Sequence, residues 1–523
     1  MDTSIAAPEV SRRRFFGVVG GLSGTALLAA CGDSGSTTNA VNRTVTYMAS
    51  SNFNGSWSPY DNLVLSNMRA QRMVYDYLMW IDDSGNFVPG LALSVKPISD
   101  TVWEAKLRTG VKFHGGQAFT AKDVKASIEL ASNPASVTGS LFPGQLTVDV
   151  IDDFTAHINT STPFAPLLGA CLAANQSGAI ISADDAAKGP NFLKTKMNGT
   201  GPFKMESYNG EAGGLILKAN TEYWRGAPKI DGVTMKFVSD TTTRLAALQA
   251  GQADIVEGMG PDEAKLLQTS ADATVTTTTS TDSMILSFRD QTAPVDNATL
   301  RQALCFAIDV PTIVRSIYGG YATVNTAFGQ PNTMGYEDDP NFYKYDPAKA
   351  KQLLSKAGFP NGKGLRELTF VSVVGNYPKA KEYCELIVQN LADIGVKVKL
   401  DLRDATSWAD ALFKQEGDMI LHGWLVPTPD RNAWYTSLFR TKGLVSFASD
   451  PAIDAAIKAQ SAALDNAQRV KIIKTQLELA LVKYAPAFPM FTYDIITGVS
   501  KKLQGLAVPH WYEFDMFPVS KGA

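Results

Sequence analysis

The sequence predicts an α/β protein that is built from more than one structural unit, and three observations support this. Segments with the two-residue alternation of strands follow segments with helix-capping signals along most of the chain. The chain has 523 residues, which is too many for one hydrophobic core. Of these residues, 45% are apolar and 19% are charged, an ordinary globular composition with ample core material.

The N-terminal segment carries the pattern of a cleaved export signal. Ser11, Arg12 and Arg13 stand before a phenylalanine pair as in the twin-arginine export signal, and Leu-Ala-Ala before Cys31 resembles the lipobox of bacterial lipoproteins. The apolar stretch between them is broken by glycines and is shorter than the about 20 residues that a membrane-spanning helix needs. We therefore expect a signal peptide over residues 1–30, then acylated Cys31 and a flexible polar tether over 31–42.

The first element after the tether is a predicted strand at Thr44–Met48. The loop 50–62 that follows mixes amides, hydroxyls and aromatic rings at the end of this strand, a usual place for ligand contacts in open α/β sheets. An ordinary polar turn is the alternative, because turns favour the same residues. From this loop we predict Asn52, Phe53 and Trp57 as ligand-binding residues.

A strand, a turn and a helix are predicted over residues 102–131. Val102–Leu107 alternates as a strand does, and glycines turn the chain after it. Thr120 and Asp123 have the spacing of a capping box, which predicts that a helix begins there.

Similar signals for the starts and ends of helices continue along the chain. Asp240 predicts the N-cap of a helix that ends at Gly251, and Asp254–Val256 follows as a strand. A later helix is expected to stop at Gly395, with a strand at Val396–Leu400.

Several of these segments resemble one known family. Trp103–Glu129, WEAKLRTGVKFHGGQAFTAKDVKASIE, is similar to the signature of solute-binding proteins of the peptide/nickel ABC-importer family. It departs from that signature at Gly115 and Ala118, where Asp and Pro are usual. Three further segments resemble the family: NGTGPF at Asn198–Phe203, Leu217–Gly226, and LRQALCFAID at Leu300–Asp309. The resemblance covers nearly all of residues 45–515.

The resemblance implies a two-lobe periplasmic-binding-protein fold with an extra subdomain in the first lobe, the arrangement called cluster C. Lobe one is expected to take residues 43–285, including the extra subdomain at about 63–197. Lobe two is expected over 286–497, and residues 498–523 return to lobe one.

The resemblance also points to a ligand-binding loop after a predicted strand that ends at Leu421. Gly423–Phe439 resembles the family's W-x-ADYPDP loop, whose Asp pairs with the α-amino group of peptide ligands. That position is Pro427 here, and Val374 stands where dipeptide binders carry an Arg for the ligand carboxylate. A buried zwitterion without these partners is costly, so we expect the ligand not to be a free dipeptide. The further predicted ligand-binding residues are Thr200, Trp424, Thr428, Asp430, Trp434 and Tyr493.

No catalytic or metal-binding pattern is found in the sequence. The four histidines are far apart, and there is no HExxH, GxSxG, P-loop or GxGxxG pattern. We expect no cofactor and no metal. Cys171, Cys305 and Cys384 form an odd set without a close pair, which favours buried apolar cysteines and leaves a disulfide open. The formal net charge of −3 gives no electrostatic footprint for nucleic acid.

Together these features predict a monomeric substrate-binding lipoprotein of an ABC importer, not an enzyme, held outside the cytoplasm by its lipid anchor. Its partners would be the permease and ATPase subunits. Its ligand would be oligopeptide-like or another neutral or aromatic small molecule. An oligosaccharide or a metal chelate bound by the same fold is the alternative, and an exported enzyme or a signalling receptor is the alternative of another class.

Overall fold

A computed structural model describes residues 43–53, 55–61, 64–82, 84–169, 173, 176–375, 377–426, 428–508, 510 and 514–522. These residues fall in the compact unit Asn42–Ala523. The predicted signal peptide, tether and Cys31 lie outside the described residues, as do Pro427 and Cys171.

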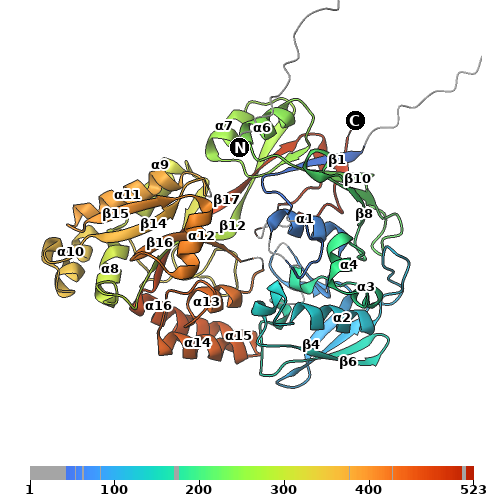
Figure 1. Cartoon of the computed structure of the whole chain (residues 1–523), viewed down its shortest axis with the longest axis horizontal. Helices are drawn as coiled ribbons and strands as arrows, with labels where there is room; N and C mark the ends of the chain where they lie inside the picture. The colour runs from blue at the N-terminus through green and yellow to red at the C-terminus, as the bar shows by residue number, and fades with distance from the viewer. Residues whose placement is uncertain are drawn as a thin grey trace, which may run out of the picture. The chain divides into compact units, whose positions relative to one another are not determined.

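An eleven-stranded mixed sheet runs through the described residues (Figure 1). In sheet order its strands are β15 (Val398–Arg403), β14 (Leu368–Val373), β16 (Met419–Leu425), β12 (Ala273–Phe288), β17 (Ala487–Ser500), β11 (Ile255–Val256), β1 (Thr44–Ala49), β10 (Gly232–Phe237), β9 (Leu215–Ala219) and β8 (Phe203–Tyr208), with β13 (Ala322–Val324) paired to β17. The parallel pairs β1–β10 and β14–β15 lie on either side of the antiparallel pair β12–β17.

Four further strands form a separate antiparallel sheet with α2 over it, at the lower right of Figure 1. Their order is β4 (Ala92–Pro97), β5 (Val102–Leu107), β7 (Thr155–Asn159) and β6 (Thr147–Asp152). Two short hairpin-like pairs complete the strands: β2 (Met79–Ile81) with β3 (Phe87–Pro89), and β18 (Leu503–Gln504) with β19 (Ser520–Lys521). The four-stranded sheet agrees with the predicted extra subdomain, whose limits remain a prediction.

The α-helices divide between the two ends of the large sheet. Before β12 they are α1 (Leu65–Val74), α2 (Ala121–Ala131), α3 (Ala183–Ala186), α4 (Pro190–Thr195), α5 (Gly210–Gly213), α6 (Thr241–Gln249) and α7 (Pro261–Leu267). After β12 they are α8 (Ala298–Ala307), α9 (Val310–Ile317), α10 (Pro347–Lys356), α11 (Ala380–Asp393), α12 (Ala405–Lys414), α13 (Asn432–Leu438), α14 (Pro451–Ala462), α15 (Asn466–Ile472) and α16 (Leu479–Tyr484).

The capping signals read from the sequence begin these helices as predicted. Thr120 and Asp123 form the capping box of α2, with the Thr120 N–H donating to the Asp123 carboxylate over 2.7 Å. The Asp240 carboxylate accepts from the Thr243 N–H at the start of α6. Each cap satisfies a backbone N–H that has no partner within the first turn of the helix.

Two large hydrophobic cores lie on either side of the β12–β17 pair. One takes buried apolar side chains from Val45 to Ile255 and again from Ile495 to Val519. The other takes them from Met284 to Phe491. A smaller cluster packs α6 and α7 against β17. The predicted two-lobe α/β fold is confirmed, and the residue limits given for each lobe stay a prediction.

Strands β12 and β17 are the backbone connection between the lobes. They pair from Ala273 with Ser500 to Ser287 with Ala487. Strand β17 contributes to both large cores, and β12 contributes to the core of lobe two and to the smaller cluster. The pairing is interrupted between Thr279 and Ser283. An interrupted ladder bends a strand and concentrates its twist. We call this stretch of β12, with the residues of β17 opposite it, the pivot.

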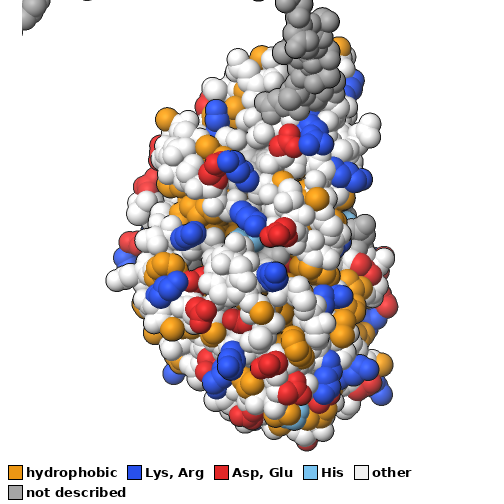
Figure 2. Space-filling view, turned by 90° about the vertical axis from the view of Figure 1, so that its right-hand side faces the viewer, with side chains coloured by type: hydrophobic (Ala, Val, Ile, Leu, Met, Phe, Trp, Pro, Cys, Tyr) orange, Lys and Arg blue, Asp and Glu red, His pale blue; other side chains and the backbone are white. Residues whose placement is uncertain are grey.

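Charges of both signs alternate over the face drawn in Figure 2, with no large patch of one sign. Such a surface lacks the basic stripe that nucleic acid requires on that face. In the part of the chain that the structure covers, we find no helix with the length and apolarity to span a bilayer.

Candidate functional site

The predicted aromatic residues after β1 form a cluster with a residue from β8. The ring of Phe53 lies 5.3 Å from that of Trp57, and Tyr208 lies 5.7 and 5.2 Å from Phe53 and Trp57. Phe53 and Trp57 are 7% and 3% exposed, so they are mostly core residues. The amide of the neighbouring Asn52 donates to the exposed Glu211 carboxylate.

Thr200 lies apart from this cluster, beside a buried carboxylate. Its hydroxyl donates to Asp76 over 2.9 Å. The Tyr223 hydroxyl and the Trp224 indole donate to the same carboxylate, over 2.9 and 2.8 Å. Burial raises the pKa of Asp76, and these three hydrogen bonds oppose the rise. Thr200 therefore has a partner within the lobe.

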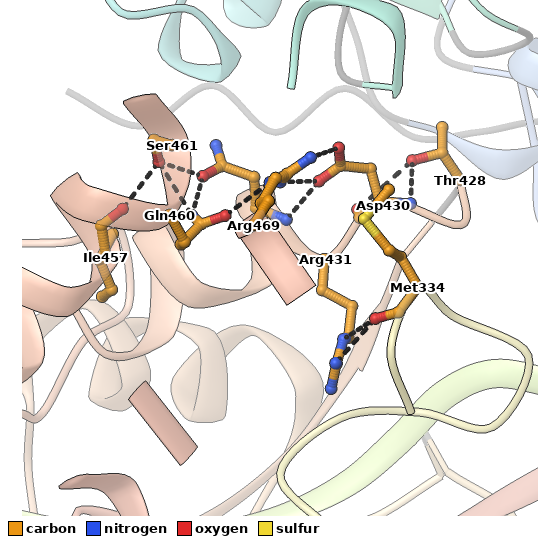
Figure 3. A network of polar contacts seen from close by, with 9 residues as sticks. Met334, Thr428, Asp430, Arg431, Ile457, Gln460, Ser461 and Arg469 are labelled. Carbon is orange, nitrogen blue, oxygen red and sulfur yellow. Dashed lines mark hydrogen bonds and ion pairs between the residues drawn. The ribbon is translucent and has the colours of Figure 1, made fainter. Parts of the chain in front are cut away.

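The loop after β16 holds Asp430 in an internal ion pair (Figure 3). Arg469 on α15 donates to both carboxylate oxygens, over 2.5 and 2.7 Å, and both side chains are buried. Burial raises the pKa of Asp430, but Arg469 outweighs burial and the net pKa is lowered. The Thr428 hydroxyl accepts from the Asp430 N–H over 3.3 Å. This arrangement occupies both carboxylate oxygens with a partner that the sequence did not reveal.

Arg431, next in the chain, ties the same loop to a segment that follows β13. It donates to the Phe328 and Met334 carbonyls over 2.7 and 2.8 Å and forms an ion pair with Glu478. A Cβ at Gly329 would lie 2.1 Å from the Arg431 Nη1, so a larger residue there would displace the Arg431 side chain. Asp430 and Arg431 thus fix this loop from its two sides.

Trp434, Trp424 and Tyr493 have different surroundings. Trp434 on α13 is fully buried, with its ring 4.8 Å from that of Phe439, and belongs to the core of lobe two. Trp424 on β16 is half-buried and stands opposite Ser283 of β12. Tyr493 on β17 is half-buried and its hydroxyl donates to Asp282 of β12. The structure therefore brings Trp424 and Tyr493 to the pivot.

A closed ring of polar side chains lies next to that pivot. The hydroxyls of Ser283 and Thr492 are 2.8 Å apart, the Thr492 hydroxyl donates to the Asn325 carbonyl oxygen, and the Asn325 amide donates to Ser283. All three residues are buried. A buried network in which each side chain is hydrogen-bonded fixes the position of β12 relative to β17 in lobe two.

Asp282 is the titratable group at the pivot that the sequence analysis did not single out. Its Oδ2 accepts from Tyr493, while its buried Oδ1 has no hydrogen-bond partner among the described residues. Burial raises the pKa of Asp282 to about 6, and the Tyr493 hydroxyl and the backbone N–H of Trp424 limit the rise. Asp282 follows a run of threonines and serines in β12, so its sequence neighbours gave no signal that singled it out.

A second polar side chain that lacks partners among the described residues is Gln330, in the segment that Arg431 holds. It is fully buried, and neither its amide nitrogen nor its amide oxygen has a hydrogen-bond partner there. A buried amide in this state lowers stability, because its hydrogen bonds to water are not replaced.

Contacts between the lobes are made at several places. The Ala165 N–H donates to the Ser461 carbonyl over 2.7 Å, and Lys379 pairs with Asp262 over 3.0 Å. A Cβ at Gly169 would lie 2.4 Å from the Asp430 Cβ, which places this glycine directly against the loop after β16. These are contacts that a separation of the lobes would break.

Burial shifts the pKa values of two histidines and two cysteines in the direction that favours their neutral forms. Burial lowers the pKa of His114 and of His422 to about 4, so both are neutral at pH 7. Cys305 and Cys384 are buried free thiols, and burial raises the pKa of each. Among the described residues, no group of three His, Cys, Asp or Glu side chains could hold a metal ion.

Comparison with known proteins gives the following relatives. Residues 86–444 match the model of the bacterial extracellular solute-binding proteins, family 5. The glutathione-binding protein GsiB of Pectobacterium atrosepticum is 29% identical over 469 residues, covering 87% of this chain and 89% of GsiB.

Two solved structures superpose over most of the chain. The substrate-binding protein CtaP of Listeria monocytogenes has a TM-score of 0.81 at 21% identity, covering 92% of this chain and all of CtaP. AgaA of A. tumefacien R10, solved with agropinic acid, has a TM-score of 0.75 at 25% identity, covering 92% of this chain and 99% of AgaA.

Proposed function

The chain belongs to the bacterial extracellular solute-binding proteins, family 5, as the substrate-binding component of an ABC importer, and on that premise we propose that it captures an oligopeptide-like or other neutral or aromatic solute between its lobes. The lobes would close on the solute, and the closed form would dock on the permease. Closure would be a shift between two populated states, with no chemistry done on the solute.

The observation that carries this proposal is the pivot in the β12–β17 pair. The two strands continue into both lobes, and their pairing is interrupted between Thr279 and Ser283. A bend at this stretch moves one lobe against the other without repacking either core, because the two cores lie on opposite sides of it. Cross-lobe contacts such as Lys379 with Asp262 would then form on closure.

The proposed ligand class is supported by the residue at position 374 and by the ligands named for two relatives. Val374, at the aligned position of the carboxylate-binding Arg, is an exposed apolar residue. This disfavours a free zwitterionic dipeptide. A relative at 29% identity is named for glutathione, and one at 25% was solved with agropinic acid, so small solutes with several polar groups are the first to test.

We further propose that the protein is a monomeric lipoprotein on the outer side of the cell membrane. The twin-arginine pattern and the lipobox before Cys31 support this. Several acyl chains on one cysteine give stable anchoring where a single chain would be marginal.

Native mass spectrometry of the purified protein tests the proposal. We expect one small solute to be retained unmodified, with its release on partial unfolding. Conversion of that solute by the purified protein would instead support an exported enzyme. Uptake of the solute should be lost when the gene is deleted; intact uptake with intact binding would favour a signalling receptor.

A further inference from the structure

We infer that Asp282, held by Tyr493, forms a subsite for a cationic group of the ligand, an organic ammonium or guanidinium. The inference deepens the proposed solute-binding function and rests on it. It assigns a binding role to a residue that lies outside the loop after β16.

The strands place the Asp282 carboxylate on the pivot. Asp282 stands opposite Leu425 of β16 and is the last residue of the stretch of β12 that does not pair with β17. The Tyr493 hydroxyl reaches it from β17. A Cβ at Gly423 would lie 3.1 Å from the Asp282 Oδ1 and 2.9 Å from the Tyr377 ring, so glycine lets both side chains approach this strand.

The titratable side chains near Asp282 include phenols, Asp494 opposite Thr279, and His510, whose ring contacts the Thr279 carbonyl. Tyr493 donates to Asp282, and the Tyr377 hydroxyl accepts from the Gly423 N–H beside it. Burial raises the pKa of Tyr318 on α9 and of Tyr383 on α11, and the charge of Asp282 adds to the rise. These two phenols are therefore neutral at pH 7. Asp282 forms no ion pair with any described residue.

Three buried carboxylates are treated differently, whereas one oxygen each of Asp61, Asp290 and Asp494 also lacks a hydrogen-bond partner among the described residues. Asp430 has Arg469 on both oxygens, and Glu478 has Arg431. Asp76 lacks a direct ion pair with a described residue but accepts three hydrogen bonds. Asp282 accepts from Tyr493 on one oxygen, and its second oxygen is buried without a partner in the described part of the chain. An isolated carboxylate is costly to bury, so a cation from the ligand would supply the missing partner.

The location agrees with the sequence of the binding loop. In the family that this chain resembles, the loop after β16 carries an Asp for a ligand amine, and Pro427 stands at that position here. Asp282 lies on the neighbouring strand, and its side chain is partly exposed. A cation bound there favours the charged carboxylate, so its binding should release a proton at and below about pH 6.

An NMR titration of the full-length protein, labelled with ¹³C at aspartate carboxyl groups, tests the subsite. One carboxyl signal should titrate near pH 6 and be missing in Asp282→Asn. In about 50 mM n-butylammonium chloride its midpoint should fall by at least about half a pH unit relative to sodium chloride at equal ionic strength. The neutral n-butanol is the matched control and should leave the midpoint unchanged.

The variant Tyr493→Phe keeps the test decisive if Asp282→Asn does not fold. It removes the hydroxyl that donates to Asp282 Oδ2, so it should raise the midpoint of the same signal. An identical midpoint in the two salts would overturn the subsite.

The solute retained by the purified protein separates this inference from the proposed function. A retained solute without a cationic nitrogen would overturn the subsite and leave solute binding intact. A midpoint shift in a protein that converts its solute would support the subsite and overturn the transport role.

Discussion

Arg469 and Asp430 form a buried ion pair through two hydrogen bonds, with Nη1–Oδ2 and Nη2–Oδ1 distances of 2.5 and 2.7 Å. The pair joins α15 to the loop after β16. The side chain of Asp430 also lies against Gly169 of the other lobe. A single internal contact thus shapes the surface that one lobe presents to the other.

Asp430→Asn should lower the free energy of unfolding by about 3–5 kcal/mol, because it leaves the Arg469 guanidinium buried without its charge partner. Chemical denaturation of the variant measures this loss. Lys414→Ala is the control: it breaks an exposed ion pair with Asp410, which should cost at most about 1 kcal/mol. Equal losses in the two variants would contradict the role given to Asp430.

The same pair should weaken in acid. The pKa of Asp430 is lowered in the folded protein, so the native state binds fewer protons than the unfolded state near the ordinary carboxyl pKa. Stability from this pair is present above that pKa and is lost as pH falls through the folded value. Asp430→Asn should therefore flatten the acid limb of the stability profile below about pH 4.

His422 should affect the pH dependence of stability at higher pH than Asp430 does. Burial lowers its pKa in the folded protein to about 4 from the ordinary histidine value of 6.5, so the unfolded state takes up the proton first as pH falls. Stability should drop by up to about 3 kcal/mol between about pH 6.5 and pH 4. His422→Gln should remove most of this slope in pH-dependent urea unfolding, whereas a slope equal to that of the parent would refute it.

Gln330→Met should stabilise the ligand-free protein by about 1–3 kcal/mol, because it removes a buried amide that has no hydrogen-bond partner among the described residues on either atom. Thermal unfolding at neutral pH measures the change. Gln389→Met on the exposed side of α11 is the matched control and should stay within about 0.5 kcal/mol of the parent. Destabilisation by Gln330→Met would mean that the amide has a partner in solution.

Cys31→Ser should release the protein from membranes. The serine cannot carry the thioether-linked lipid, so the body would lose the anchor proposed for it. Fractionation of expressing cells with detection of the protein in the supernatant checks this. The control is Cys305→Ala, which removes a buried cysteine of lobe two and should leave the protein membrane-bound. Membrane retention of Cys31→Ser would contradict the proposed lipid anchor.

Free dipeptides at about 1 mM should not raise the melting temperature, whereas the true solute should do so by mass action. The reason is that Val374 offers no partner to a ligand carboxylate. A thermal-shift screen that includes glutathione as a tripeptide probe checks this. A clear dipeptide response would show that the alignment of Val374 or Pro427 is wrong.

Individual elements could be predicted because their signals are local: the capping box of Thr120 and Asp123 lies within four residues of sequence. The two-lobe fold was predicted from the family resemblance of several such segments. The site was harder to predict, because its partners are distant. Arg469 is 39 residues from Asp430, and Tyr493 is 211 residues from Asp282.

The aromatic residues illustrate the same difficulty. Trp424 on β16 and Trp434 on α13 lie ten residues apart, yet one is half-buried beside the pivot and the other is fully buried in a core. Composition favours both roles for tryptophan equally. Only the packing of α13 on the core of lobe two separates them.

Strand β17 has a consequence for the order in which the protein is made. It pairs with β12 on both sides of the pivot, with β11 on one side and with β13 on the other, yet it spans residues 487–500 of a 523-residue chain. Neither lobe can complete its sheet until nearly all of the polypeptide has left the ribosome. A chain assembled in this way suits an export route that moves folded proteins. A product truncated before Ala487 would lack β17, so the sheet would be incomplete in both lobes.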